Sequence, residues 1–202
     1  KTEWSPDGSS WTLLPALRWD YFKSLKEHFL LPRMGARYKW DNSLNFKLGS
    51  GIYVQPPAPQ EVDSEFGNLA VKSTRAYQWM MGFEKDFRQG QSEGTVLGIN
   101  YFDKWFDRLV IESRSYVNRD GVVVPEVYNN EGRGRALGLE LSLKNYFTDS
   151  FSSLLSYTIS RSTRWNPNQS EYVFQYDQTH NLNWILAKDI KSGSWKNWRW
   201  SS

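Results

Sequence analysis

The sequence predicts an all-β fold, namely an antiparallel transmembrane β-barrel segment of about eight to nine strands with short periplasmic turns and long extracellular loops. Three observations predict it. Apolar and polar residues alternate over many stretches, short and long connections alternate between those stretches, and aromatic residues are abundant, with 11 each of Trp, Tyr and Phe among 202 residues. A period of two is the period of a strand, in which successive side chains point to opposite faces.

The clearest alternation lies between 132 and 190. From 137 to 144, leucine alternates with glycine or a polar residue, so one face of that strand is apolar and the other polar. The pattern returns after a tight turn and again after a polar loop, over 151–160 and 181–186. We expect the leucine face to contact lipid, and Glu140 and Lys144 to face the lumen.

Further strands are expected before residue 132. The same alternation is present over 13–20, 33–40, 44–55, 75–87 and 94–112. Pro56 and Pro57 end the third of these strands, because proline lacks the N–H that a strand ladder needs. A last strand is expected to begin at Trp195.

Short and long connections alternate along the chain. The short ones lie near Asp41, Gly90, Thr148 and Gly193, and the long ones are 56–74, 113–131 with its loop proper at 118–130, and 164–174. Short turns at one end and long loops at the other are the layout of an outer-membrane barrel. A soluble antiparallel sheet shows the same residue alternation, so the connections and the aromatic content favour the membrane barrel.

The two predicted faces differ in chemistry. The polar face, which suits a hydrated lumen, contains Arg18, Asp20, Arg33, Arg37, Lys39, Lys47, Glu84, Glu140 and Lys144. Tryptophans fall near strand ends or on the apolar face, as an interfacial girdle requires; they are Trp11, Trp19, Trp40, Trp79, Trp105, Trp184, Trp198 and Trp200.

Composition excludes several classes of protein. The mean hydropathy of -0.66 and the lack of a run of ~20 apolar residues argue against a helical membrane protein. The net charge of +3 arises from 25 basic and 22 acidic residues without a basic run, so no nucleic-acid partner is expected. With no cysteine, the chain has neither disulfides nor thiolate metal sites.

No catalytic residue, metal site or cofactor is expected. Asp177 and His180 offer acid-base groups, but three residues apart on a strand they point to opposite faces, and no nucleophile accompanies them. Glu61, Asp63 and Glu65 lack the ordered spacing and the glycine of a calcium loop. A solvated acidic loop is the better interpretation of these carboxylates.

Ligand contacts are expected in the long loops, because recognition on barrels is carried by outer loops. Aromatic side chains with hydrogen-bonding tips in three loops suit an aromatic siderophore or a sugar. The candidates are Tyr53, Gln55, Gln60, Phe66 and Asn68 in the first, Tyr116, Arg119 and Tyr128 in the second, and Arg164, Trp165, Tyr172 and Tyr176 in the third. Packing within the loops is the alternative role for each of them.

Three stretches of the chain also resemble a known family. They are LLPALRWDYF at 13–22 followed by LPRMGARYKW at 31–40, GSGIYVQPPAPQEVDSEFGN at 49–68, and GRGRALGLELSLK with LSYTISRS and YDQTHNLNWILA between 132 and 187. In this order they resemble recurring barrel segments of the TonB-dependent outer-membrane receptors, and the resemblance covers most of the chain.

The resemblance implies an outer-membrane barrel of about 22 strands whose lumen is closed by a plug domain. Such receptors import scarce ligands such as siderophore-iron complexes, cobalamin or oligosaccharides, with energy from the TonB coupling complex acting through the plug. The implied partners are outer-membrane lipid, the remainder of the barrel, the plug and TonB. Because no plug segment or coupling box is seen in the sequence, residues 1–202 are expected to be a portion of a single barrel domain.

Three alternatives remain open on sequence alone. The first is a self-contained small outer-membrane barrel with a structural or adhesin role, a size that barrels do adopt. The second is a soluble, Trp-rich β-sandwich that binds carbohydrate. The third is a hydrolase that uses Asp177 and His180.

Overall fold

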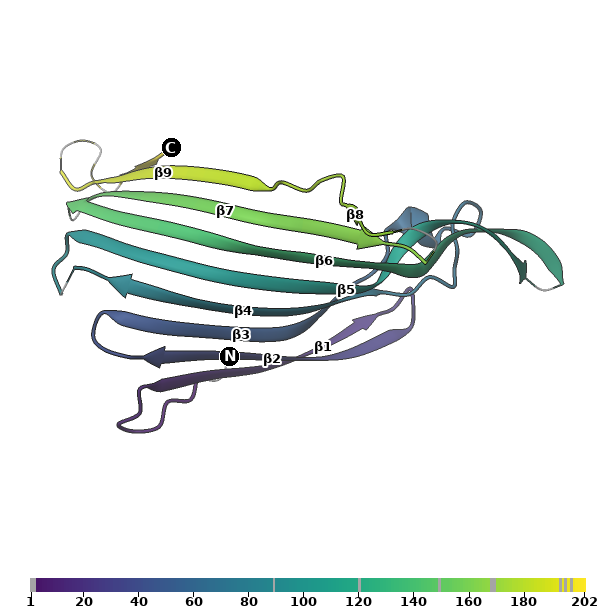
Figure 1. The fold of residues 1–202 in the computed structure, drawn as a ribbon, viewed down its shortest axis with the longest axis horizontal. Helices are drawn as coiled ribbons and strands as arrows, with labels where there is room; N and C mark the ends of the chain where they lie inside the picture. Colours follow the sequence, from purple (N-terminus) through teal and green to yellow (C-terminus); the bar gives the residue numbers. More distant parts are fainter. Residues whose placement is uncertain are drawn as a thin grey trace.

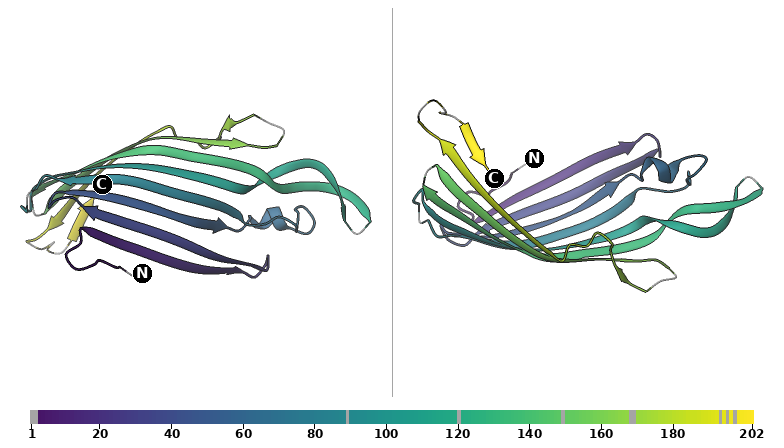
Figure 2. Two further views of the ribbon diagram at one scale, coloured as in Figure 1. Left: turned by 60° about the horizontal axis from the view of Figure 1, so that its bottom comes forward. Right: turned by 90° about the horizontal axis from the view of Figure 1, so that it is seen from above.

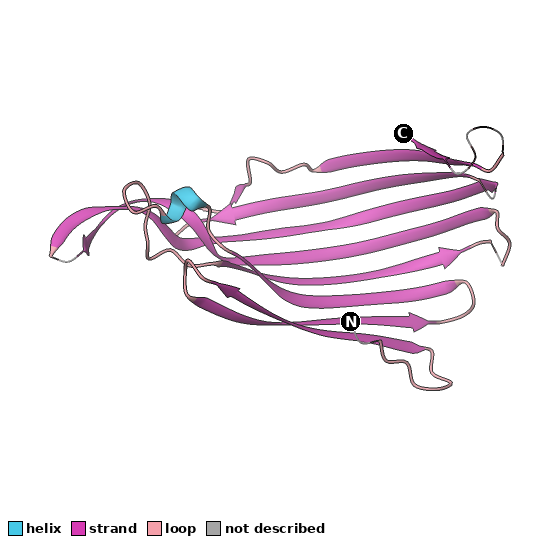
Figure 3. Ribbon diagram, turned by 180° about the vertical axis from the view of Figure 1, so that it is seen from behind, coloured by secondary structure: helices cyan, strands magenta, loops and turns pink. Residues whose placement is uncertain are grey.

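The chain folds into one antiparallel sheet of ten strands (Figure 1). The computed structural model describes residues 3–88, 90–119, 121–148, 150–167, 170–192, 194, 196 and 198–202. The strands are β1 (Trp11–Phe22), β2 (Glu27–Lys39), β3 (Leu44–Gln55), β4 (Thr74–Asp86), β5 (Gly94–Arg119), β6 (Val122–Thr148), β7 (Phe151–Trp165), β8 (Tyr172–Val173), β9 (His180–Ile190) and β10 (Trp198–Ser201). A short 3-10 helix, η1 (Pro59–Val62), lies between β3 and β4 (Figure 3).

The strands pair in the order of the chain, with β8 as a side branch on β7. Within the described residues, β1 pairs with no strand but β2 and β10 with no strand but β9, so the two edges of the sheet do not meet. One further bridge joins Leu13 of β1 to Trp4 in the segment before it. The sheet curves from one edge to the other (Figure 2). The predicted all-β, antiparallel class is confirmed, and the sheet is a single curved wall without a second sheet packed on it in this part of the chain.

Connections separate by length as predicted, with two exceptions. The turns after β2, β4, β6 and β9 lie at one end of the sheet, which we call the turn end. The long segments after β3 and β7 and the tip of the β5–β6 hairpin lie at the other end, which we call the loop end. Two connections are short although they lie at the loop end: residues 23–26 between β1 and β2, and residues 120–121 between β5 and β6.

The predicted loop at 118–130 is largely strand, which corrects the sequence interpretation. β5 and β6 continue as a paired hairpin out to Arg119 opposite Val122, beyond the rest of the sheet (Figure 1). The register shifts three times along this ladder, and Val127 has a positive φ of 63°. Each bulge breaks the period of two, which is why alternation could not reveal these strands.

Other details of the strands also differ from prediction. β2 begins at Glu27, six residues before the predicted start at 33. The additional residues include Phe29 and Leu31, which are buried. The third loop contains the two-residue strand β8. Trp195, the predicted start of the last strand, lies outside the described residues, and the strand observed there is Trp198–Ser201.

The pairing register assigns the faces of the sheet. One cross-strand row runs through Arg37, Lys47, Gly82, Asn100, Glu140, Thr158 and Asn181. By the same register, all nine charged residues predicted for the polar face share this side. It is the concave side, since a hollow of about 240 Å³ is lined by side chains of β3 to β7, including Lys47, Glu84 and Lys144.

The opposite, convex face is apolar and exposed. Its large exposed side chains include Leu17, Trp19, Leu30, Leu48, Met81, Leu139, Leu141, Leu155, Ile159, Leu182 and Trp184. A soluble sheet buries such a face in a core, whereas a membrane barrel presents it to lipid. No helix in the described part of the chain has the length and apolarity to cross a membrane.

Candidate functional site

The loop end contains four of the five buried hydrophobic side chains among the described residues, the fifth being Val96 of β5. Phe29 and Leu31 of β2, Ala76 of β4 and Val71 of the first loop are at most 9% exposed. The first loop, residues 56–73, therefore packs onto the sheet instead of extending into solvent. The position of this loop determines what the rim of the concave face presents.

Side-chain hydrogen bonds join the first loop to the β5–β6 hairpin. The Asn68 amide donates to the Tyr128 carbonyl at 2.6 Å, and its oxygen accepts from the Ala70 N–H. Asn130 accepts from the Lys72 N–H at 2.6 Å and donates to the Lys72 and Arg108 carbonyls. We call these bonds of Asn68 and Asn130 the clip.

A second contact fixes the end of the same loop. Ser73, which is fully buried, donates to the Glu27 carboxylate from its hydroxyl at 2.6 Å and from its backbone N–H at 3.1 Å. Thr74 donates to the Arg108 carbonyl at 3.1 Å. The loop is thus hydrogen-bonded to β2 on one side and to the β5–β6 hairpin on the other, and these bonds hold it in a fixed position against the sheet.

The acidic residues of the first loop cap its own turns. Glu61 accepts from the Ala58 N–H at 2.7 Å, and Asp63 accepts from the N–H groups of Phe66 and Glu65. Those two donors hold the pKa of the Asp63 carboxyl below its usual value. At Gly67, a side chain would meet backbone atoms of Asp63, Gln60 and Glu61 within 2.8 Å, so the tight fold requires glycine.

The third loop covers a polar groove on the concave face. The groove is an open hollow of about 490 Å³, and most of its lining residues are serine, threonine, asparagine or glutamine. We call it the β7–β9 groove; it is lined by Glu140, Ser156, Thr158, Ser160, Ser162, Phe174, Tyr176, Asp177, Gln178, Asn181 and Asn183. A surface of this kind can hydrogen-bond an oxygen-rich ligand and stack against its rings.

Arg164 contacts two residues that line the groove, Phe174 and Ser162. Its guanidinium lies between the rings of Phe106 and Phe174, at 4.8 and 4.3 Å from their centroids. It also donates to the Ser162 hydroxyl and the Thr163 carbonyl. Cation–π contacts on both sides fix the guanidinium in place.

Some of the predicted ligand-contact residues meet and others do not. Tyr176 lines the groove, Arg164 contacts the lining residues Phe174 and Ser162, and Tyr172 is exposed on β8. Asn68 and Tyr128 meet in the clip, where Asn68 is 5% exposed. The others lie apart: Tyr53 is on the concave face under the Arg33 guanidinium, Gln55, Gln60 and Phe66 are exposed, and Tyr116 is exposed on the hairpin.

Two further candidates, Trp165 and Arg119, lie on β7 and at the end of β5. Trp165 lies on the convex face, edge-on to Trp105 with ring centroids 6.4 Å apart, and so points away from the groove. Arg119 ends β5, and its side chain lies outside the described part of the structure. The groove residues of β7 and β9, such as Thr158 and Asn181, were missed in the sequence, although the polar positions of the last two predicted strands contained them.

Asp177 and His180 are hydrogen-bonded to different residues and not to each other. Asp177 accepts from the Ser162 N–H at 2.6 Å and from the Thr179 hydroxyl at 3.0 Å. His180 is hydrogen-bonded through Nδ1 to the Tyr157 hydroxyl at 2.7 Å, with the two rings stacked. No group of three or more His, Cys, Asp or Glu residues capable of holding a metal ion is found among the described residues.

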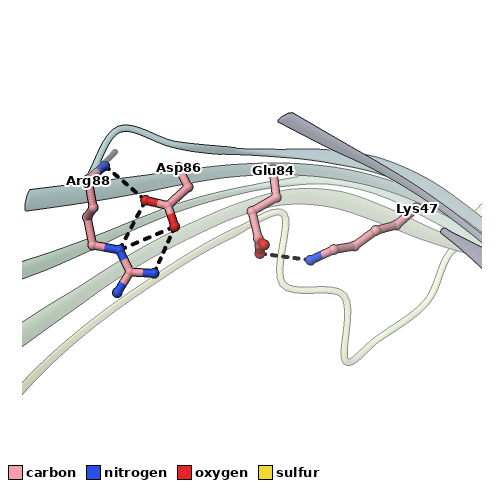
Figure 4. Close-up of polar contacts among 4 residues, drawn as sticks. All are labelled: Lys47, Glu84, Asp86 and Arg88. Atoms are coloured by element: carbon pink, nitrogen blue, oxygen red, sulfur yellow. Dashed lines mark hydrogen bonds and ion pairs between the residues drawn. The ribbon is translucent and has the colours of Figure 1, made fainter. Parts of the chain in front are cut away.

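The turn end has shorter-range polar contacts (Figure 4). On the concave face, Lys47 donates to Glu84 at 2.7 Å, and at the end of β4 the Arg88 guanidinium forms an ion pair with Asp86 at 2.8 Å. In the turn after β2, Asp41 accepts from the hydroxyl and N–H of Ser43 and from the N–H of Leu44. These donors lower the pKa of Asp41 to about 2.

Solved structures share this architecture. The ferric enterobactin receptor PfeA of Pseudomonas aeruginosa superposes with a TM-score of 0.68 at 15% identity over 94% of this chain and 29% of its own. The pyoverdine outer membrane receptor FpvA of the same organism gives 0.66 at 11% identity over 94% and 27%. The alcaligin receptor FauA of Bordetella pertussis gives 0.63 at 13% identity over 95% and 33%. The chain thus spans about a third or less of these receptors.

Comparison with the curated proteins gave no match. The family model described as TonB dependent receptor-like, beta-barrel, matches residues 1–202, the whole of the sequence. Members of that family are outer-membrane transport receptors and not enzymes. The family match, together with a curved antiparallel wall that is polar inside and apolar outside, shows that the chain belongs to the TonB-dependent receptor β-barrel family.

Proposed function

We propose that this chain forms part of the wall of an outer-membrane, ligand-gated importer and that a siderophore-iron complex is the imported ligand. The observation that carries the proposal is the pairing of an exposed apolar convex face with a polar groove on the concave face of the same strands. Three receptors of similar fold are described as receptors for ferric enterobactin, pyoverdine and alcaligin. Cobalamin or an oligosaccharide are the other ligands considered.

The unpaired edges support a larger barrel. Apart from the single bridge between Leu13 and Trp4, β1 and β10 each leave one side without a partner strand in the described residues, and an exposed edge in lipid leaves backbone groups unsatisfied. We propose that further strands of the same barrel pair with these edges. The remaining partners of the full receptor would be membrane lipid, a plug domain in the lumen and the TonB complex.

The β7–β9 groove is the proposed place of ligand contact. Its hydroxyls and amides suit the oxygen atoms of a chelated iron complex, while Tyr176, Tyr172 and Phe174 offer aromatic faces. Among the sequence candidates, Phe66 and Tyr116 are exposed at the same end and can approach a ligand from above. Asn68 and Tyr128, in contrast, hold the loops together.

The test uses the full-length receptor in cells that lack other iron-siderophore receptors. Thr158→Trp fills the groove, whereas Ile159→Trp places the same side chain on the convex face one residue away. We expect Thr158→Trp to lower uptake of radiolabelled ferric siderophore at least about tenfold, equal to a loss of about 1.4 kcal/mol in binding. Ile159→Trp should transport normally, since lipid tolerates tryptophan.

Two outcomes would contradict the proposal. If the Thr158→Trp receptor transports as well as the unaltered receptor, the groove is not on the ligand's path. If the unaltered receptor takes up none of a panel of ferric siderophores, cobalamin and oligosaccharides, the importer assignment is wrong. Both variants are first checked for normal amounts of folded receptor in the outer membrane.

A further inference from the structure

Three arginines lie together on the convex face at the loop end of β6 and β7. They are Arg133, Arg135 and Arg161, and we call them the arginine patch. In the register of the two strands, Arg133 is opposite Trp165, Arg135 is opposite Thr163, and Leu137 is opposite Arg161. All six side chains therefore belong to the face that carries the exposed leucines.

The patch directly borders the apolar band. Toward the turn end, the convex positions of β6 are Leu137, Leu139, Leu141 and Leu143, and those of β7 are Ile159, Tyr157 and Leu155. None of these residues is charged, and Leu139, Leu141, Leu155 and Ile159 are 38–42% exposed. Arg161 is thus the first charged residue met on leaving this band.

Aromatic side chains mark the same level of the sheet. Trp105 packs edge-on to Trp165, Trp79 packs against Tyr101 at 5.2 Å, and the stacked Tyr157–His180 pair lies just below Arg161. Trp and Tyr gather where hydrocarbon meets headgroups. On the orientation assumed under the proposed function, on which this inference rests, the patch lies at the headgroup level of the outward leaflet.

The three guanidinium groups differ in their availability. Arg135 makes two bonds to the Asp103 carboxylate, at 3.0 and 2.7 Å, and covers the Trp105 ring at 4.3 Å. Arg133, 64% exposed, has only a 3.8 Å ion pair to Asp107. Arg161 is exposed and has no ion pair or side-chain hydrogen bond within the described residues.

Arg135 and Asp103 therefore form a fixed pair, whereas the guanidinium of Arg161 and that of Arg133, whose ion pair to Asp107 is long and solvent-exposed, can bind an anion. Asp103 is only 2% exposed, and its ion pair with Arg135 at 2.7 Å balances its charge. Arg133 and Arg161 stand four positions apart across the two strands, roughly 13 Å along the sheet at ~3.3 Å per residue. Guanidinium groups bind phosphate with two parallel hydrogen bonds.

We propose that Arg133 and Arg161 bind the phosphate groups of anionic lipids in the outward leaflet, with the acyl chains lying along the leucines of β6. A bilayer lipid is the occupant because the cationic groups border an exposed apolar face that only acyl chains match. A soluble anion would gain nothing from that face. The expected effect is about fivefold in lipid affinity for each arginine, at about 1 kcal/mol per basic residue near an anionic surface.

The test measures lipid retention by the full-length receptor in detergent, using native mass spectrometry with added phosphatidylglycerol or zwitterionic phosphatidylcholine. The unaltered receptor should retain phosphatidylglycerol preferentially. The double variant Arg133→Gln/Arg161→Gln should lose about 30-fold in phosphatidylglycerol affinity. Arg133→Lys/Arg161→Lys should keep part of it, which separates charge from misfolding. Arg18→Gln/Arg37→Gln, which removes two charges from the concave face, is the matched control.

Three results would overturn the inference: equal phosphatidylglycerol retention by the Gln variant, an equal loss in the concave-face control, or displacement of the lipid by millimolar inorganic phosphate. The last would identify a site for a soluble anion. Ligand uptake is measured on the same preparations. Retention that depends on the arginines in a receptor that imports nothing would refute only the proposed function, whereas normal import without such retention would refute only the lipid site.

Discussion

The two faces of β6 differ in the residues that they present and in the environment that those residues suit. Between 137 and 144, leucines on the convex side, of which Leu139 and Leu141 are exposed, alternate with a glycine or polar residue on the concave side. Leu141 is 38% exposed in a chain that has little buried core, whereas its neighbour Glu140 lines the β7–β9 groove. The difference indicates that lipid, and not a packed core, is the environment that stabilises the convex side.

The largest expected effect comes from placing a charge on the convex face. Leu141→Arg in the full-length receptor should destabilise the folded protein in lipid vesicles by about 2–4 kcal/mol, the cost of arginine near the bilayer midplane. Denaturant unfolding followed by tryptophan fluorescence measures this change. Glu140→Arg, the matched substitution one residue away, should change the free energy of unfolding by far less. Equal effects at 140 and 141 would show that the two faces do not differ in solvent.

The next effect separates the clipped loop from the rest of the loop end. Asn130→Ala removes three hydrogen bonds of the clip and leaves the Lys72 N–H without a partner. A lost partner of this kind costs about 1–3 kcal/mol, so exchange of the 70–73 amides should accelerate by roughly tenfold or more. Hydrogen exchange with mass spectrometry measures this. Asn129→Ala is the control, because among the described residues the Asn129 side chain bonds only to Glu126 and Glu131 of its own strand. If it gives the same acceleration, the clip is not responsible.

The smallest effect is expected at the turn end and depends on pH. The folded-state pKa of Asp41 is about 2, below the value of about 3.9 for an unfolded chain. Its stabilising contribution is therefore present above pH ~4 and is lost as the pH falls toward ~2. Asp41→Asn should lower stability at neutral pH and reduce the loss on acidification, measured by unfolding at several pH values. Asp7→Asn, in the segment before β1, is the control, and an unchanged acid profile in Asp41→Asn would contradict the assignment.

The sequence was sufficient to predict the main strands of the sheet but not the structure at the loop end. The period of two from 137 to 144 is a direct consequence of strand geometry, and it predicted both the strand and its faces. The β5–β6 extension was missed, because bulges near Val127 and Arg108 interrupt that period. Val122, Val123 and Val124 were the available signal, since β-branched residues favour strands.

The candidate site depended on contacts between distant parts of the chain. Asn68 and Tyr128 were both predicted to contact a ligand, but nothing in their local sequence reveals that Asn68 donates to the Tyr128 carbonyl. The polar residues of β7 and β9 were visible as an alternating set, yet their convergence with Phe174 and Tyr176 requires the third loop to fold back over them. Loop side chains gain their roles from such tertiary contacts.

The central claim is that alternate residues of β6 face lipid and water. It is tested most directly by introducing single cysteines at each position from 137 to 144 of the full-length receptor in vesicles and measuring the accessibility of an attached spin label. The account predicts that positions 137, 139, 141 and 143 are accessible to membrane-dissolved oxygen, and that positions 138, 140, 142 and 144 are shielded from it. Uniform accessibility along the strand, or oxygen access at the even positions instead, would contradict the account.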